Sequence, residues 1–170
     1  LAPQPVMNNT IDSVAPVFAS ATVNGSFLVV SYTETDALSD AAPLGSAFSV
    51  KVGPTATAVD NPVTSVFVSP NAKTITLGLT NPILNAQVVI VAYTDPTVDN
   101  DVNAVQDASG NDALSLTVQT VTNATPIDIL PPVFTTAVAN GSEITLNFSD
   151  ASLLSTTTVL KNATTNYFSN

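Results

Sequence analysis

The chain resembles itself at an offset of 116 residues, and this self-similarity limits its possible folds more than any other feature. Three motifs recur in the same order and without a gap: Pro16-Val17-Phe18 as Pro132-Val133-Phe134, Asn24-Gly25-Ser26 as Asn140-Gly141-Ser142, and Tyr32-Thr33-Glu34 as Phe148-Ser149-Asp150. A period of this length is well above the roughly 20 to 50 residues of solenoid repeats. It is typical of independently folding domains in series, so we expect a tandem repeat.

The repeat divides the chain into three segments. We expect residues 13–125 to form one complete repeat, residues 126–170 to hold the first strands of a following, incomplete repeat, and residues 1–12 to hold the last strand of a preceding repeat or a donor strand. The first segment matches the end of the complete repeat at an offset of 115 residues, which aligns Val6, Asn8 and Thr10 with Val121, Asn123 and Thr125.

A partial repeat would leave a bare sheet edge and an uncovered apolar face. Either the chain is an excerpt of a longer protein, or a neighbouring repeat or identical subunit completes the partial unit. In the second case residues 1–10 are the expected donated strand. Such a head-to-tail arrangement would propagate into a filament.

Short runs rich in Val, Ile, Thr, Phe and Tyr alternate with turn residues in the complete repeat and predict seven strands. These are Val17 to Val23, Ser26 to Thr33, Ala47 to Val52, Val63 to Ser69, Lys73 to Leu79, Gln87 to Thr94 and Leu114 to Thr122. Asn24-Gly25 predicts a hairpin between the first two, because both positions tolerate positive φ. A short helical turn could form within Ala37 to Gly45. We predict an all-β fold, an immunoglobulin-like two-sheet sandwich, with a closed barrel as the alternative.

The charge balance excludes several classes of partner. Thirteen acidic residues against three lysines give a net charge of −10, which repels nucleic acid and anionic lipid. No apolar stretch approaches the roughly 20 residues of a membrane span. Only 9% of residues are charged, against roughly 25% in ordinary soluble domains. We therefore expect no nucleic acid partner, no membrane span and a secreted or cell-surface location.

Acidic residues gather after two of the predicted strands. The candidate metal ligands are Glu34 and Asp36 after the second strand, and Asp95, Asp101, Asp107 and Asn111 in the long connection before the last strand. Loops after alternate strands of a sandwich lie at one end, so these groups are expected to meet. Calcium, which takes about 6 to 8 oxygen ligands, is the predicted cofactor. The alternative is that they are solvated turn residues around Gly110.

The composition argues against catalysis. Without His, Cys or Arg, nucleophilic triads lack their usual base and oxyanion groups. The paired acids of a glycosidase would need a raised pKa and an aromatic-lined cleft. The chain has no Trp and three Tyr, of which Tyr32 and Tyr93 fall in predicted strands. We therefore expect no enzymatic activity.

Six Asn residues lie in sequons for N-linked glycosylation, namely Asn8, Asn24, Asn123, Asn140, Asn147 and Asn162. One interpretation is a glycosylated, exposed surface. The favoured interpretation is chance, because a chain rich in Asn, Ser and Thr forms such triplets readily, and two of them coincide with Asn-Gly hairpins.

Four motifs of the complete repeat carry a family resemblance: P-V-F-A-S-A-T-V-N-G from Pro16, S-Y-T-E-T from Ser31, A-Y-T-D-P from Ala92 and V-Q-D-A-S-G-N from Val105. With them, the segment from Pro16 to Thr125 resembles the SwmB-type immunoglobulin-like repeats of cyanobacterial motility-associated and other very long bacterial surface proteins. The resemblance implies a surface-exposed structural or adhesive array that is stiffened by calcium.

These observations predict a structural or adhesive module of an extracellular repeat protein or surface filament. Its expected partners are neighbouring repeats or identical subunits. The alternative is a calcium-dependent carbohydrate-binding module, which would hold a sugar through calcium and exposed Asn or Asp side chains.

Overall fold

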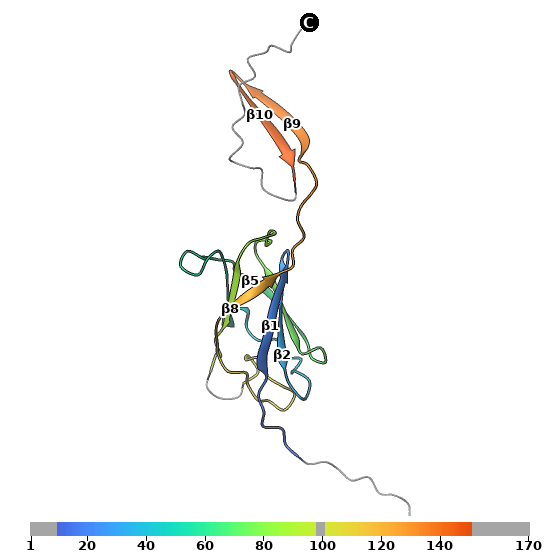
Figure 1. Ribbon diagram of the computed structural model, residues 1–170, viewed down its shortest axis with the longest axis vertical. Coiled ribbons are helices and arrows are strands. Elements are labelled where there is room, and N and C mark those ends of the chain that lie inside the picture. The colour runs from blue at the N-terminus through green and yellow to red at the C-terminus, as the bar shows by residue number, and fades with distance from the viewer. Residues whose placement is uncertain (1–9, 98–100, 151–170) are drawn as a thin grey trace, which may run out of the picture. The chain divides into compact units, whose positions relative to one another are not determined.

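The computed structural model describes residues 10–97 and 101–150, which fall into two compact units divided between Ile127 and Asp128 (Figure 1). Each unit is described by itself. Among the described residues, no helix is both long enough and apolar enough to cross a membrane.

The described residues of the first unit form eight strands and one short helical element. The strands are β1 (Val17–Asn24), β2 (Phe27–Thr33), β3 (Phe48–Val52), β4 (Val59–Asp60), β5 (Val63–Ser69), β6 (Thr74–Leu79), β7 (Val89–Tyr93) and β8 (Leu116–Asn123). The helical element is a 3-10 turn, η1 (Gly45–Ala47). All seven predicted strands are present, and the all-β prediction is confirmed. β4 was not predicted, because two residues carry no periodic pattern.

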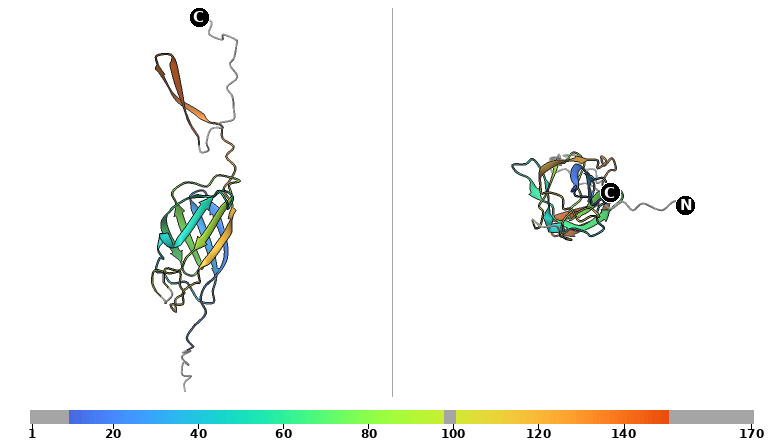
Figure 2. Two further views of the ribbon diagram at one scale, coloured as in Figure 1. Left: turned by 90° about the vertical axis from the view of Figure 1, so that its left-hand side faces the viewer. Right: turned by 90° about the horizontal axis from the view of Figure 1, so that it is seen from below.

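The eight strands form one sheet in the order β4-β3-β7-β8-β1-β2-β6-β5. Neighbouring strands are antiparallel except for β1 and β8, which pair in parallel through Thr22 with Thr122 and Val23 with Asn123. The sheet curls around its own core, as Figure 2 shows. The parallel pair between β1 and β8 joins what would otherwise be two separate antiparallel sheets.

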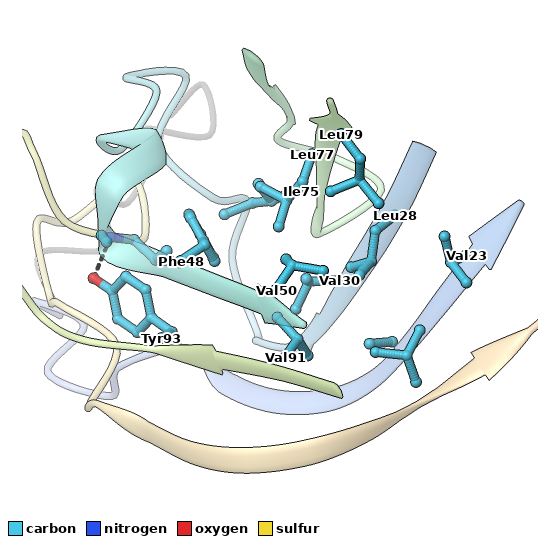
Figure 3. Packing of buried hydrophobic residues seen from close by; sticks show 14 of the residues in the cluster. Val23, Leu28, Val30, Phe48, Val50, Ile75, Leu77, Leu79, Val91 and Tyr93 are labelled. Atoms are coloured by element: carbon cyan, nitrogen blue, oxygen red, sulfur yellow. Dashed lines mark hydrogen bonds between the residues drawn. The ribbon is translucent and has the colours of Figure 1, made fainter. Parts of the chain in front are cut away.

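The core is built from the alternating inward residues of these strands. In β2 every second residue, Leu28, Val30 and Tyr32, is buried. β6 adds Ile75 and Leu77, and β3, β7 and β8 close the cluster from the other half of the sheet (Figure 3). Burying side chains of this size contributes about 1.5 to 3 kcal/mol each, so the curled sheet is stabilised by one shared core.

The direction of the strands determines where the loops lie. Because β1 and β8 are parallel, the chain enters the first unit at one end and leaves it at the other (Figures 1 and 2). We call the end at which residues 10–16 enter β1 the leading end. β2 and β7 are antiparallel to β1 and β8, so both finish at the leading end.

The described part of the second unit, residues 128–150, contains a hairpin of β9 (Val133–Asn140) and β10 (Glu143–Ser149). Its strand register equals that of β1 and β2 after a shift of 116 residues. Phe134 pairs with Phe148 as Phe18 pairs with Tyr32, and Asn140 pairs with Glu143 as Asn24 pairs with Phe27. The irregularity also recurs, because the register skips Ala19 in the first hairpin and Thr135 in the second.

In both hairpins the two-residue loop begins at the glycine and not at the preceding asparagine, one residue later than the sequence predicted. The pair between Asn24 and Phe27 leaves Gly25 and Ser26 as the two loop residues. Gly25 has φ +57° and Ser26 is not among the positive-φ residues. A loop with positive φ at its first position alone matches the type II′ preference for glycine there, and it differs from the type I′ loop that Asn24-Gly25 would form.

The two hairpins differ in burial. Leu28, Val30 and Tyr32 of β2 are buried in the core. Their counterparts in β10 are exposed, Ile144 by 70%, Leu146 by 53% and Phe148 by 43%. Among the described residues, the second hairpin therefore presents an apolar face of the kind that the first hairpin packs into a core.

Candidate metal centre

The structure brings the loop after β2 and the connection between β7 and β8 together at the leading end. The Ser39 amide donates to the Gln106 oxygen over 2.9 Å, and the Ala108 amide donates to the Ala37 oxygen over 2.9 Å. Leu38 also forms an isolated antiparallel bridge with Asp107. These bonds place Glu34 beside Asp107, as the sandwich arrangement of loops predicted.

The acidic side chains there separate into two clusters. In the first, carboxylate oxygens of Asp12, Glu34 and Asp107 all lie within 4.8 Å of one another. In the second, the same holds for Asp95, Asp101 and Asp112. The sequence pattern had combined Glu34, Asp95, Asp101 and Asp107 in one site, and the structure distributes them over two.

Three elements position the first cluster. Asp12 lies in the segment before β1, and its Oδ1 accepts a hydrogen bond from the Val14 amide over 2.9 Å. Glu34 follows β2, and its Oε1 accepts bonds from the Thr35 amide over 2.5 Å and the Asp36 amide over 3.3 Å. These bonds orient each carboxylate and leave its second oxygen available.

Asp107 is held by the D-A-S-G-N turn. Its Oδ1 accepts bonds from the amides of Ser109 and Asn111, both over 2.8 Å, and its Oδ2 accepts a bond from the Asn111 side-chain amide over 2.7 Å. Gly110, with φ +88°, closes the turn in a conformation that other residues rarely adopt. The Asn111 side-chain amide also donates to the main-chain oxygen of Asp12 over 3.2 Å, so it bridges two members of the cluster.

The first cluster concentrates negative charge in a largely buried place. Glu34 and Asp107 are exposed by only 8% and 1%. Two like charges about 5 Å apart repel each other by about 3 kcal/mol at an effective dielectric constant of about 20. Neither described lysine offsets this charge by an ion pair: Lys51 pairs with Asp60, and Lys73 donates to the main-chain oxygens of Glu34 and Thr35.

One oxygen of the first cluster has no hydrogen-bond partner among the described residues. This is Glu34 Oε2, which is buried, although Oε1 of the same carboxylate is bonded to two amides. Buried polar atoms are nearly always hydrogen-bonded, so each exception calls for an explanation such as an ion. This atom separates the cluster from an ordinary solvated acidic turn.

The carboxylates of the second cluster are more exposed than Glu34 and Asp107, and hydrogen bonds from several side chains and amides reach them. The Asp112 carboxylate accepts bonds from the Asp101 amide over 2.9 Å and the Gln106 side chain over 3.0 Å. Hydrogen bonds from the Thr97 hydroxyl and the Asn103 amide lower the pKa of Asp101. Partial burial and the negative charge of Asp112 raise the pKa of Asp95. Asp95 Oδ1 lacks a partner, but the residue is only partly buried.

The remaining predicted ligands take different places. Asp36 is exposed and reaches Glu34 only through its main-chain amide. Asn111 belongs to the first cluster by hydrogen bonds. Sequence reasoning missed Asp12 and left Asp112 out of the site. A signal for Asp12 existed, because Asp128 lies 116 residues later, at the offset that relates the other recurring motifs.

The sequon residues differ in how free their side chains are. Asn123 donates from its side-chain nitrogen to the main-chain oxygens of Leu84 over 2.8 Å and Gln87 over 3.0 Å. Glycosylation modifies that nitrogen, so modified Asn123 would lose a bond of the folded unit. Asn24, Asn140 and Asn147 are exposed, whereas Asn8 and Asn162 lie outside the described residues.

Comparison with known proteins gives one family and one fold. The sequence profile described as a putative flagellar system-associated repeat matches residues 11–98, just over half of the 170-residue chain. No curated protein matches the chain. Among solved structures, domains 1–6 of the surface layer protein SbsC match with a TM-score of 0.51 and 16% identity, over 79% of this chain and 18% of that one.

The N-terminal part of the bacterial S-layer protein SbsC matches with a TM-score of 0.51 and 16% identity, over 82% of this chain and 33% of that chain. The chain thus spans 18% to 33% of the length of these structures. At such low identity the structural likeness establishes a shared fold and nothing more. By its sequence, the chain belongs to the family of putative flagellar system-associated repeats.

Proposed function

We propose that the chain is a structural, non-enzymatic part of an extracellular tandem-repeat protein, secreted or displayed on a cell surface. In this proposal residues 13–125 are one immunoglobulin-like repeat whose two antiparallel half-sheets form a sandwich joined by β1 and β8. Each repeat serves as a stiff spacer in a stalk, adhesin shaft or filament of the SwmB type. Calcium is a stiffening ligand in this proposal.

The recurrence of one hairpin register in both units supports the proposal most directly. β9 and β10 repeat the pairing of β1 and β2 residue by residue, including the skipped position. A two-residue loop is common to many hairpins, but an irregularity at the same position of the register depends on local sequence and is not expected in two unrelated hairpins. We infer that β9 and β10 are the first two strands of a following repeat.

The course of the chain through the first unit fits a linear array. The parallel pair of first and last strands places the incoming and outgoing segments at opposite ends of the unit. Domains with this topology can follow one another along the chain in a linear array, because each begins at the end opposite to the one at which it finishes. The outgoing segment contains Pro126, Pro131 and Pro132, and proline favours an extended, stiff connection.

The exposed apolar face of the second hairpin fits an incomplete repeat. In the first unit β1 pairs with β8 and β2 pairs with β6, and residues of β3 and β7 share the core with those of β2. We infer that in the assembled protein equivalent strands pair with β9 and β10 and cover their apolar face, either from the same chain or from a neighbouring subunit. This would bury Ile144, Leu146 and Phe148 as their counterparts are buried.

The family and the fold agree with this function. The chain belongs to a family of putative flagellar system-associated repeats, and proteins of bacterial surface layers share its fold. Antibodies raised against residues 13–125 test the location on the source cells. We expect them to label intact, unpermeabilised cells or shed material. Labelling that appears only after permeabilisation would contradict a surface function.

Strand donation between subunits has a separate test. In the first unit Thr22 pairs with Thr122, and the repeat offsets place Val138 at the position of Thr22 and Met7 at that of Thr122. The chain has no cysteine, so a Met7→Cys and Val138→Cys double variant introduces the only two. Donation of residues 1–10 predicts a disulfide-linked ladder of subunits under mild oxidation. Monomers alone, as expected for a Met7→Cys and Ser142→Cys control, would exclude this donor.

A further inference from the structure

We propose that Asp12, Glu34 and Asp107 bind a calcium ion that fastens residues 10–16 to the leading end of the first unit. The binding of the ion stands on the geometry of these residues alone. Its role as a fastener of successive repeats rests on the proposed array function.

The partnerless oxygen of Glu34 is the observation that carries the site. Glu34 is more than nine-tenths buried, and its Oε2 makes no hydrogen bond to any described residue. Carboxylate oxygens, one each from Glu34, Asp12 and Asp107, lie within 4.8 Å of one another. Three oxygens no more than 4.8 Å apart all lie within about 2.8 Å of a common centre, which is close to the roughly 2.3 to 2.6 Å of calcium–oxygen bonds.

The ligand chemistry selects a hard divalent cation. The chain contains no His and no Cys, which excludes the nitrogen and sulfur ligands that favour zinc and copper. Three carboxylates from three separate segments form an irregular cage. Calcium accepts irregular geometry and completes its shell with carbonyl, amide and water oxygens, whereas magnesium requires a nearly ideal octahedron at about 2.1 Å.

The three ligands come from segments far apart in sequence, and this gives the ion a mechanical role. Asp12 lies in the incoming segment, Glu34 after β2 and Asp107 in the turn between β7 and β8. The direct hydrogen bond from Asn111 to the Asp12 oxygen spans 3.2 Å. An ion shared by the three carboxylates would add a charged bond between the incoming segment and two loops of the unit.

The first two ligands recur in the next repeat. Asp128 and Asp150 lie 116 residues after Asp12 and Glu34. Asp128 also repeats the local turn, because its Oδ1 accepts a bond from the Leu130 amide over 3.0 Å, as Asp12 does from the Val14 amide over 2.9 Å. A carboxylate is therefore preserved at both positions of the second unit, which points to one ion at each junction between repeats.

Calcium titration of the complete chain tests the site. The protein is dialysed against EGTA and titrated with CaCl2 by calorimetry, and bound ions are counted by native mass spectrometry. We expect Glu34→Gln and Asp107→Asn to weaken calcium binding by about tenfold or more, because affinity follows the number of charged ligands. Asp36→Asn, on an exposed neighbour, should leave it unchanged. Circular dichroism checks that each variant folds.

Two results would overturn the site. One is the absence of binding at millimolar CaCl2 in the unaltered chain. The other is binding that survives Glu34→Gln and Asp12→Asn but is lost in Asp95→Asn, which would locate the ion in the second cluster. Replacement of CaCl2 by MgCl2 should give much weaker binding, and equal affinity would contradict the assignment of calcium.

Hydrogen exchange tests the fastening role separately. We expect CaCl2 to slow amide exchange in a peptide covering residues 10–16, and Asp12→Asn to remove this protection while the core strands stay protected. If calcium binds but exchange in this segment does not change, the ion site stands and its role at the junction is wrong. The surface location of the protein is decided independently by labelling of cells.

Discussion

The hydroxyl of Tyr93 accepts a hydrogen bond from the main-chain amide of Val105 over 2.9 Å, and both residues are buried (Figure 3). Tyr93 ends β7, and Val105 lies in the long connection between β7 and β8. The bond therefore anchors the connection to the core, and Asp107 lies in this connection two residues after Val105. The ring of Tyr93 also packs against Phe48 at a centroid distance of 5.2 Å.

Removal of this hydroxyl should destabilise the first unit. Tyr93→Phe leaves the buried Val105 amide without an acceptor, which costs about 1 to 3 kcal/mol. Urea unfolding followed by circular dichroism measures the difference in the free energy of unfolding. The matched control is Tyr32→Phe, because the Tyr32 hydroxyl is buried and has no hydrogen-bond partner in the described part of the chain. Tyr32→Phe should be neutral or stabilising, and Phe148 already occupies the equivalent position of the second hairpin. An equal loss in the free energy of unfolding for Tyr93→Phe and Tyr32→Phe would contradict a stabilising role of the Tyr93–Val105 hydrogen bond.

Alkaline pH should destabilise the protein through the same two tyrosines. Burial raises the pKa of Tyr93 from 10.0 to about 12, and burial also raises the pKa of Tyr32. Because the folded state favours the protonated phenols, their contribution to stability is complete below about pH 10 and falls as pH rises through about 12. Urea midpoints measured across this range should decline, and the decline should be smaller in Tyr93→Phe. A urea midpoint that stays unchanged up to pH 12 would contradict a stabilising role of the protonated tyrosines.

Matched truncations in the two hairpins should differ strongly in cost. Leu28 is fully buried, whereas its counterpart Ile144 is 70% exposed. Leu28→Ala should lower the free energy of unfolding by about 2 to 5 kcal/mol, and Ile144→Ala by less than about 0.5 kcal/mol. Thermal unfolding of the isolated chain measures both. In an assembly that completes the second repeat, Ile144→Ala should become as costly as Leu28→Ala, and a cost that stays small would argue against completion.

A buried asparagine between β4 and β5 should contribute strongly to the stability of the first unit. Asn61 is 2% exposed, and its side chain donates to the Asn81 oxygen over 2.8 Å and accepts from the Asn81 amide over 2.9 Å. Asn61→Ala removes both bonds and should cost about 1 to 3 kcal/mol. Asn85→Ala is the control, since exposed Asn85 makes one bond, to the Thr125 oxygen over 2.8 Å. Urea unfolding should give a clearly lower free energy of unfolding for Asn61→Ala than for Asn85→Ala.

Local features of the sequence predicted the elements of the fold. The seven strands followed from the alternation of apolar and polar residues and the hairpin from its Gly-containing turn, because both depend on backbone geometry within a few residues. The position of that turn was one residue off, since pairing of Asn24 with Phe27 satisfies the core pattern of both strands. The offset of 116 residues also anticipated the shared register of the two hairpins.

Long-range pairing could only come from the tertiary structure. The parallel contact of β1 with β8 joins residues about a hundred positions apart, and no pattern within either strand specifies its neighbour. The acidic residues could likewise be identified from the sequence, but the sequence does not specify which of them lie together, because they come from distant segments. Asp12 joins Glu34 and Asp107 because the incoming segment passes the ends of two loops, while Asp95 and Asp101 lie with Asp112. Composition limited the candidate ligands to oxygen atoms, and the folding of distant loops decided which oxygens meet.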